Sequence, residues 1–445
     1  MTLRTPFGRR VAGVFATRVA RFAISMAISF LLARILLAEG RGQYATLLLV
    51  PGMLMALGQL GLPSAMSFFA GRGRSLADLR RLGLLLTVLL SLVFVGGTLL
   101  MLPLLGPTIF ATAPRDLIIV ALASLPFQLV AAFAGSTLIG RQRLRTYNFI
   151  LVGQSVLMLG LLIVLVGVAG LGVAGALIAY VTVAVLAAIA TSVELNRAVR
   201  EDAAEPARPA IGLSQVAGYG IRIYPASVTG YFSYRSDVLL LNAMVGDAGL
   251  IGLYTFAVSL AELTFFIPDS VSTVFYPRIA SMERDAADQL APQVSRFTVL
   301  ITALAVVALI PAAYLAVLVL LPDFVGSIAP FLVLMPGIVA LSISKVLAGY
   351  IGGLGLPLSV AWASGANLVI NIVANLLLIP PLGIIGAALA SLISYTAHAA
   401  MLVIVAARLS RRRPLDYVIP TRAEVGRLGD GVRELRDRVR RQPAT

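Results

Sequence analysis

The sequence predicts an all-α polytopic membrane protein with about twelve transmembrane helices in two six-helix lobes. Three observations support this fold class: composition, recurring apolar runs and an internal repeat. Of the 445 residues, 59% are hydrophobic and 12% are charged, and the mean hydropathy is +0.96. Soluble domains are roughly half apolar and about a quarter charged. This chain therefore carries more apolar surface than a water-soluble core can bury.

Apolar runs recur from end to end, and each is long enough to cross roughly 30 Å of hydrocarbon as a helix. They lack the short alternation of an outer-membrane barrel. The first run spans the membrane and carries Arg18 and Arg21 in its first turns, so we do not interpret it as a cleavable signal peptide. We predict spans that start near Val14, Tyr44, Leu82, Leu117, Tyr147, Val173, Val216, Leu250, Thr298, Val325, Pro357 and Ile384.

The segment Leu31–Gly71 is followed, about 210 positions later, by a second copy of its pattern, which begins at Leu239. Duplicated membrane units at a fixed offset are typical of transporters. Three landmarks carry the offset: Gly42–Tyr44 with Gly252–Tyr254, Pro126 with Pro336, and Leu171–Ala176 with Leu382–Ala387.

The net charge of +15 comes almost entirely from arginine, and Lys345 is the only lysine. The arginines cluster in alternate loops, whereas the intervening loops hold chiefly Arg41 and Arg115. This distribution follows the positive-inside rule and places both termini in the cytoplasm. It also argues against nucleic acid as a partner. The clusters are Arg72, Arg74, Arg80 and Arg81; Arg141, Arg143 and Arg145; Arg197, Arg200 and Arg208; and Arg278, Arg284 and Arg296.

Two six-span units of the same orientation form a parallel repeat. We predict an N-terminal lobe at 1–196, a cytoplasmic linker at 197–213, a C-terminal lobe at 214–409 and a basic cytoplasmic tail at 410–445. The tail has apolar residues at helical spacing, so it forms either an amphipathic helix on anionic lipid or a partner, or a marginal helix followed by disorder. The apolar residues are Val425, Leu428, Val432, Leu435 and Val439.

Charged residues within spans are costly and usually face a polar interior, so they are candidate functional residues. The candidate substrate-binding residues are Arg18, Arg21, Arg34, Arg222, Arg235, Lys345 and Asn371. Alternatives stay open for each group. Arg18, Arg21 and Lys345 could snorkel to the interface, and Arg222 and Arg235 could form structural ion pairs.

Asp237, Glu262 and Asp269 are candidates for ion coupling or for balancing the arginines, and the alternative is a purely structural pairing with Arg222 or Arg235. Asn371 belongs to an amide stripe with Asn367 and Asn375, which contacts either sugar or a neighbouring helix.

We expect His398, the only histidine, to be a hydrogen-bonded packing residue. The sequence has no cysteine and no paired carboxylates in an outer loop. We therefore predict no metal site, no cofactor and no enzymatic activity.

Four segments carry a family resemblance: Arg34 with Glu39–Tyr44, Leu60–Leu62, Ser233–Leu241 and Phe275–Arg278. Over roughly residues 8–410 the chain resembles polysaccharide (O-antigen type) flippases of the multidrug/oligosaccharidyl-lipid/polysaccharide (MOP) exporter superfamily. The resemblance implies two lobes in a V around a central cavity, as in the related MATE transporters. It also implies alternating-access export of undecaprenyl-pyrophosphate-linked oligosaccharide across the bacterial inner membrane.

Arginines in a cavity would offset the desolvation of a pyrophosphate through charge-assisted hydrogen bonds. The expected partners are the lipid-linked oligosaccharide, membrane lipids, H⁺ or Na⁺ as a coupling ion, and a polysaccharide polymerase or glycosyltransferase. The alternatives are a drug/cation antiporter or a lipid II-type flippase of the same superfamily, although the latter usually has fourteen spans. A polymerase or ligase would need a substantial outer loop, and the outer loops here are short.

Overall fold

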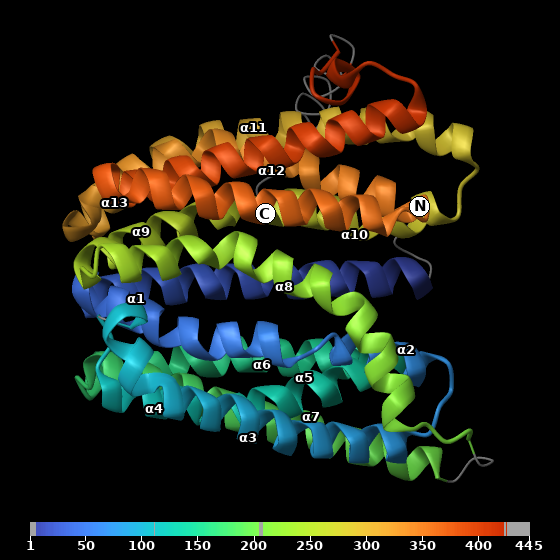
Figure 1. Ribbon diagram of the computed structural model, residues 1–445, viewed down its shortest axis with the longest axis horizontal. Helices are drawn as coiled ribbons and strands as arrows, with labels where there is room; N and C mark the ends of the chain where they lie inside the picture. The colour runs from blue at the N-terminus through green and yellow to red at the C-terminus, as the bar shows by residue number, and fades with distance from the viewer. Residues whose placement is uncertain (1–5, 111, 204–207, 422–423, 425–445) are drawn as a thin grey trace, which may run out of the picture. The chain divides into compact units, whose positions relative to one another are not determined.

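The computed structural model describes residues 6–110, 112–203, 208–421 and 424, and within these residues every regular element is a helix (Figure 1). The predicted all-α fold class is confirmed. The long helices are α1 (Pro6–Gly58), α3 (Leu76–Ile109), α5 (Leu125–Gly140), α6 (Leu144–Leu162), α7 (Gly172–Asp202), α8 (Leu213–Met244), α11 (Arg284–Leu320), α12 (Ile328–Gly353) and α13 (Pro357–Ser410). The shorter ones are α2 (Leu62–Gly71), α4 (Arg115–Leu122), α9 (Ala248–Glu262), α10 (Phe266–Ala280), the π-helical turn η1 (Ile163–Val168) and the 3₁₀ turns η2 (Leu263–Phe265), η3 (Pro322–Ser327) and η4 (Pro414–Tyr417).

Nine helical segments of the described chain are long and apolar enough to cross a membrane. Two of them contain a break that divides each into two spans, at Leu37 in α1 and at Gly383 in α13. The helix α8 has 32 residues but is too polar to count among the nine. With these two breaks and α8, the described residues contain all twelve spans predicted from the apolar runs.

The repeat landmark at the start of the last span in each half has a structural counterpart. Gly172 and Gly383 lie 211 positions apart and have φ values of 52° and 57°. Glycine adopts this left-handed region readily because it has no Cβ. Each glycine lets the chain turn directly into the next span, at the start of α7 and in the middle of α13.

The contacts divide the chain into two compact units. Unit 1 comprises Met1–Ser259, Ala316–Pro330 and Asn375–Ala387. Unit 2 comprises Leu260–Leu315, Phe331–Ala374 and Ala388–Thr445. The predicted division into lobes at 1–196 and 214–409 stays a prediction.

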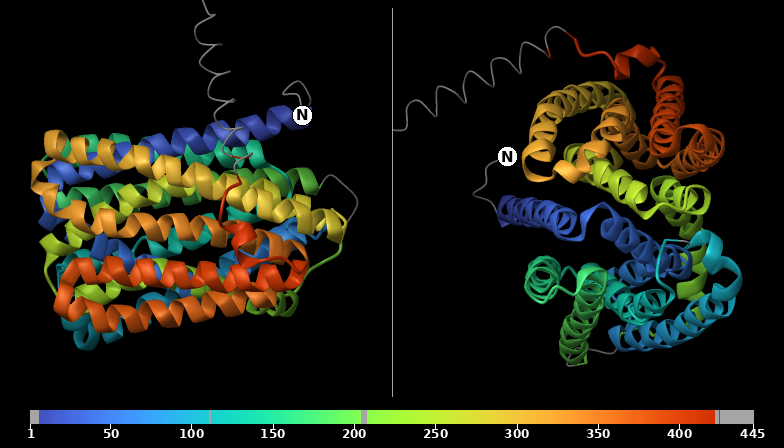
Figure 2. Two further views of the ribbon diagram at one scale, coloured as in Figure 1. Left: turned by 90° about the horizontal axis from the view of Figure 1, so that it is seen from above. Right: turned by 90° about the vertical axis from the view of Figure 1, so that its left-hand side faces the viewer.

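The helix α7 runs without interruption from Gly172 to Asp202 (Figure 2), and ion pairs join its last turns to neighbouring segments of unit 1. Asp202 lies 2.8 Å from Arg141 and 2.5 Å from Arg208, between carboxylate oxygen and guanidinium nitrogen. Glu194 accepts from Arg143 at 2.9 Å. Residues 197–202, which we assigned to the linker, therefore continue α7.

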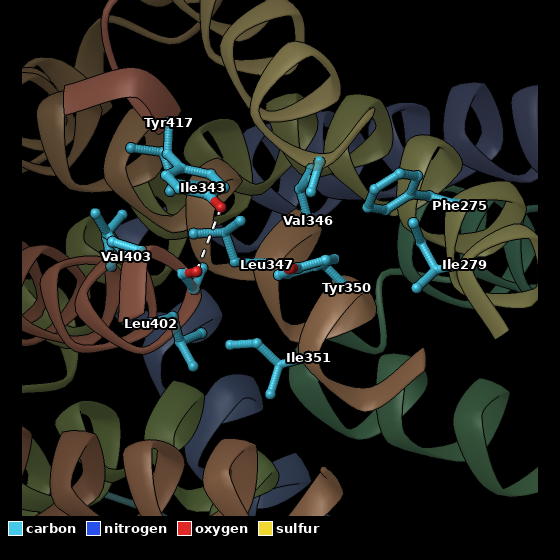
Figure 3. Close-up of a cluster of buried hydrophobic side chains, with 14 of the residues drawn as sticks. Phe275, Ile279, Ile343, Val346, Leu347, Tyr350, Ile351, Leu402, Val403 and Tyr417 are labelled. Atoms are coloured by element: carbon cyan, nitrogen blue, oxygen red, sulfur yellow. Dashed lines mark hydrogen bonds between the residues drawn. The ribbon is translucent and has the colours of Figure 1, made fainter. Parts of the chain in front are cut away.

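Unit 2 has a hydrophobic core formed by α10, α11, α12 and α13, onto which η4 folds back (Figure 3). The side chain of Tyr417 is fully buried, and its hydroxyl donates to the carbonyl of Ala406 at 3.3 Å. The hydroxyl of Ser295 on α11 donates to the carbonyl of Tyr417 at 2.8 Å. The first part of the tail is thus docked on the unit.

A bidentate ion pair extends this docking. Arg296 Nε donates to Glu424 Oε2 at 2.9 Å, and Arg296 Nη2 donates to Glu424 Oε1 at 2.7 Å. The pair is largely buried, with side-chain exposures of 13% and 7%. The predicted amphipathic helix, from Val425 to Val439, lies outside the described residues.

This pair makes stability depend on pH. The hydrogen bonds from Arg296 lower the pKa of Glu424 from 4.5 to about 2. Because the folded-state pKa is depressed, the contribution of Glu424 is complete above pH 4.5 and is lost as the pH falls towards about 2. We expect the unfolding temperature of purified protein to fall more steeply from about pH 5 to about pH 3 in the wild type than in Glu424→Gln. Asp285→Asn, at an exposed carboxylate on α11, is the control and should keep the wild-type slope. Equal slopes for the wild type and Glu424→Gln would contradict the assignment.

Candidate functional site

The opening helices of the two sequence repeats meet in a close crossing within unit 1. A Cβ built on Gly42 of α1 would lie 1.8 Å from the carbonyl oxygen of Ala248. A Cβ built on Gly252 of α9 would lie 1.8 Å from the carbonyl oxygen of Ala38. Both pairs of equivalent residues are 210 positions apart, so the contact is symmetric in the repeat. Small residues four apart let two membrane helices approach until their backbones touch.

Arg41 lies inside this crossing and is only 6% exposed. Its Nη1 donates to the carbonyl of Ser29 at 2.8 Å, and its Nη2 donates to the hydroxyls of Ser29 at 3.0 Å and Ser259 at 3.1 Å. The guanidinium also lies over the ring of Phe256, 4.9 Å from its centroid. A carbonyl, two hydroxyls and an aromatic face thus offset part of the cost of burying the charge, whereas the buried Nε has no partner among the described residues.

Arg41 was not predicted as a candidate site residue, because its position in the sequence suggested a loop. In the structure it lies in the turns of α1 that follow the break at Leu37. One signal could have identified it. Arg41 directly precedes the repeated glycine at position 42, so it must lie beside whatever packs on that glycine.

The tyrosine of the repeated Gly-x-Tyr pattern is also explained. Tyr254 is fully buried, and its hydroxyl donates to the carboxylate of Asp237 on α8. Nearby, the hydroxyl of Thr112 donates to the side-chain oxygen of Asn242 at 2.7 Å and contacts the hydroxyl of Thr46 at 3.0 Å. Asp237 thus joins α8 to α9, and its ion-coupling role stays a prediction.

The predicted arginines of unit 1 differ in exposure. Arg21 and Arg222 are exposed, and Arg235 is half-buried. Arg34 donates to the carbonyl of Leu320, the last residue of α11, at 2.8 Å. That contact caps a helix C-terminus, where a cation is favourable. The side chain of Arg18 lies outside the described residues.

Figure 1 shows that α8, which carries Arg222 and Arg235, changes direction along its length. Proline interrupts the hydrogen-bond ladder of a helix, and a bend at Pro225 stays a prediction.

In unit 2 the structure brings two predicted residues together. Lys345 Nζ lies 2.5 Å from Asp269 Oδ1 and 4.3 Å from the centroid of the Phe265 ring. Asp269 was a candidate for ion coupling or for balancing an arginine, and the cation beside it is Lys345. Glu262, the third candidate carboxylate, is half-buried at the end of α9.

The amide of Asn371 donates to the hydroxyl of Ser394 at 3.1 Å, which is the helix–helix contact that we weighed against sugar binding. His398 is buried, as predicted for a packing residue. Its predicted hydrogen bond is wrong, because neither ring nitrogen has a partner among the described residues. Ser394, four residues before His398 on the same helix, is already engaged with Asn371 and with the carbonyl of Ser391.

Across the part of the chain that the structure describes, no three His, Cys, Asp or Glu side chains are grouped so that they could hold a metal ion.

These features define a polytopic α-helical membrane protein built on a duplicated unit. Residues 10–283, more than half of the chain, match the family described as polysaccharide biosynthesis protein, and the chain belongs to that family. The resemblance found in the sequence is thereby confirmed. No curated protein matches the chain.

Solved structures of the MOP superfamily share the fold. A lipid II flippase, MurJ, in an inward closed conformation is 13% identical, with a TM-score of 0.71 over 91% of this chain and 88% of that one. An outward-facing multidrug resistance MATE transporter is 17% identical, with a TM-score of 0.62 over 93% and 97%. A mutant of the Vibrio cholerae MATE transporter VcmN is 17% identical, with a TM-score of 0.59 over 92% and 97%.

The close approach of the two backbones predicts that a single methyl group added at Gly42 lowers the stability of the protein. Gly42→Ala places its Cβ on the carbonyl of Ala248, and overpacking of this kind costs about 1–3 kcal/mol. Gly153→Ala on α6 is the matched control, because a Cβ there meets nothing within 4 Å. Thermal unfolding of the purified protein in detergent should show a lower transition for Gly42→Ala and no loss for Gly153→Ala. Equal transitions for both variants would mean that the two backbones are not in contact.

Proposed function

We propose that the protein is a flippase that moves undecaprenyl-pyrophosphate-linked oligosaccharide across the bacterial inner membrane by alternating access. The observation that carries this proposal is the match of residues 10–283 to a polysaccharide biosynthesis family. The fold that the chain shares with a lipid II flippase supports it. The arginine-rich loops support an orientation with both termini in the cytoplasm.

The substrate's head group sets the chemical requirement. A pyrophosphate is anionic, and its transfer into a low-dielectric slab must be offset by cations and hydrogen-bond donors. Arg21 and Arg222 are exposed on spanning helices of unit 1, so their guanidinium groups are accessible to a ligand. Guanidinium forks bind phosphate oxygens through charge-assisted hydrogen bonds.

The alternative is a drug/cation antiporter, which the similarity to MATE transporters favours. A cation site needs an available carboxylate. Asp237 accepts a hydrogen bond from Tyr254, and Asp269 is paired with Lys345. Two of the three candidate carboxylates are therefore engaged by the protein itself, which supports the flippase. Coupling to H⁺ or Na⁺, and association with a polymerase or glycosyltransferase, belong to the same proposal.

The first test measures flipping of a fluorescent undecaprenyl-pyrophosphate oligosaccharide in proteoliposomes. Loss of one charged hydrogen bond costs about 1.5–3 kcal/mol, so Arg222→Gln and Arg235→Gln should each slow flipping about tenfold or more. Arg115→Gln, at an exposed arginine of a predicted outer loop, is the control. Wild-type flipping by the double variant would remove both arginines from the proposed site. Export of a cationic dye that is lost in Asp237→Asn would favour the antiporter.

The second test addresses alternating access. Such a cycle requires the predicted outer ends of the helices to separate, and the crossing at Ala38 and Ala248 is the contact that must open. The chain has no cysteine, so Ala38→Cys with Ala248→Cys can be cross-linked without background. We expect transport to stop on oxidation and to return on reduction. The two single variants, oxidised in the same way, are the controls. Unimpaired transport by fully cross-linked protein would contradict opening at this crossing.

A further inference from the structure

A hollow of about 80 Å³ lies in unit 1 between the helices α3, α5 and α7. Its lining follows helical rows, so it runs along the helices as a short groove. The row on α3 runs from Leu79 to Thr87, the row on α5 from Val130 to Thr137, and the row on α7 from Ser192 to Asn196. Three of the lining residues, Gly83, Ala134 and Ser192, are small, and each comes from a different helix. From Leu79 to Thr87 it extends about 12 Å at 1.5 Å per residue.

The interior of this groove suits hydrocarbon. Leu79, Phe133 and Leu195 are buried in its walls, and Leu84 beside it is 51% exposed. The hydroxyls of Thr87 and Thr137 donate to carbonyls of their own helices, each at 2.8 Å. Hydroxyls that are satisfied in this way offer little to a sugar or to water. An acyl chain in the groove would supply the van der Waals contacts that the apolar walls lack beside the small residues.

One end of the groove carries a cation. Arg80 Nη1 donates to the side-chain oxygen of Asn196 at 2.8 Å, and the buried Nε of Arg80 has no hydrogen-bond partner among the described residues. Arg141, Arg143 and Arg208, at the same end of the helices, are all paired with carboxylates. Arg80 is held by a neutral amide, so its charge is left for an external anion.

We propose that this groove binds an anionic phospholipid from the leaflet at the arginine-rich ends of the helices. One acyl chain lies along α3 between Gly83, Ala134 and Ser192, and the phosphate contacts Arg80. A guanidinium near the interface with its stem along apolar surface is the arrangement that snorkelling produces. The site does not depend on what the protein transports, because it lies on the side of α3, α5 and α7 and uses none of the proposed substrate residues.

Native mass spectrometry of the full-length protein, titrated with phosphatidylglycerol or phosphatidylcholine, tests the site. The wild type should retain one phosphatidylglycerol in preference to phosphatidylcholine. Arg80→Gln should weaken that binding about tenfold. Arg81→Gln removes the same charge from the adjacent exposed position, outside the groove, and should bind as the wild type does.

A second variant tests the groove without altering its charge. Ser192→Leu fills the hollow with a side chain that is compatible with a membrane helix, and it should also abolish retention of the lipid. This variant keeps the proposal testable if Arg80→Gln does not fold.

Three results would overturn the proposal. Equal losses in Arg80→Gln and Arg81→Gln would show only general attraction of anionic lipid to a basic surface, which acts on any arginine there. Unchanged retention in Ser192→Leu would exclude the groove. Displacement of phosphatidylglycerol by equimolar undecaprenyl phosphate would assign the groove to the carrier lipid instead.

Discussion

The backbone contact between α1 and α9 is the constraint on which the rest of unit 1 depends. With a carbonyl oxygen 1.8 Å from where a Cβ would lie, only glycine can occupy positions 42 and 252 without displacing the neighbouring helix. The approach fixes the registers of both helices, so the residues beside the glycines have defined neighbours. Arg41 thereby meets Ser259 and Phe256, and Tyr254 meets Asp237. Membrane helices gain no hydrophobic energy from leaving lipid, so close packing and such hydrogen bonds stabilise their association.

The span pattern could be predicted from the sequence because it depends on local properties. A run of about 20 apolar residues spans the hydrocarbon core whatever its neighbours are. The repeat was equally visible, since the glycines at 172 and 383 are required by their own backbone conformation. Even the break in α1 at Leu37, which no glycine marks, falls between two predicted spans.

The pairing of charges was not predictable in the same way, because it depends on contacts between distant segments. Lys345 meets Asp269, 76 positions away, and Arg296 meets Glu424, 128 positions away. Arg41 was misassigned for a related reason. Hydropathy places any arginine near the end of an apolar run in a loop, and only the fold shows that Ser29, earlier in α1, and Ser259 of α9 accept hydrogen bonds from Arg41. The hydrogen bond expected for His398 is absent among the described residues. The sequence alone does not show which polar side chains lie beside a buried ring, because these come from other parts of the fold.

The crossing is symmetric in its small residues and asymmetric in its charge, since Arg41 has an isoleucine, Ile251, as its equivalent in the second copy. This asymmetry bears on how a closed contact can open in the proposed cycle. A buried ion pair resists separation, because breaking it leaves an uncompensated charge at a cost of about 3–5 kcal/mol. Arg41 is held by serine oxygens, and hydrogen bonds of this kind to a charged group contribute about 1.5–3 kcal/mol each. Ser29 lies in α1 like Arg41 itself, so when α1 and α9 separate, water has to replace only the hydroxyl of Ser259. The hydrogen bonds from Arg41 to serine oxygens thus stabilise the closed crossing and still allow it to open.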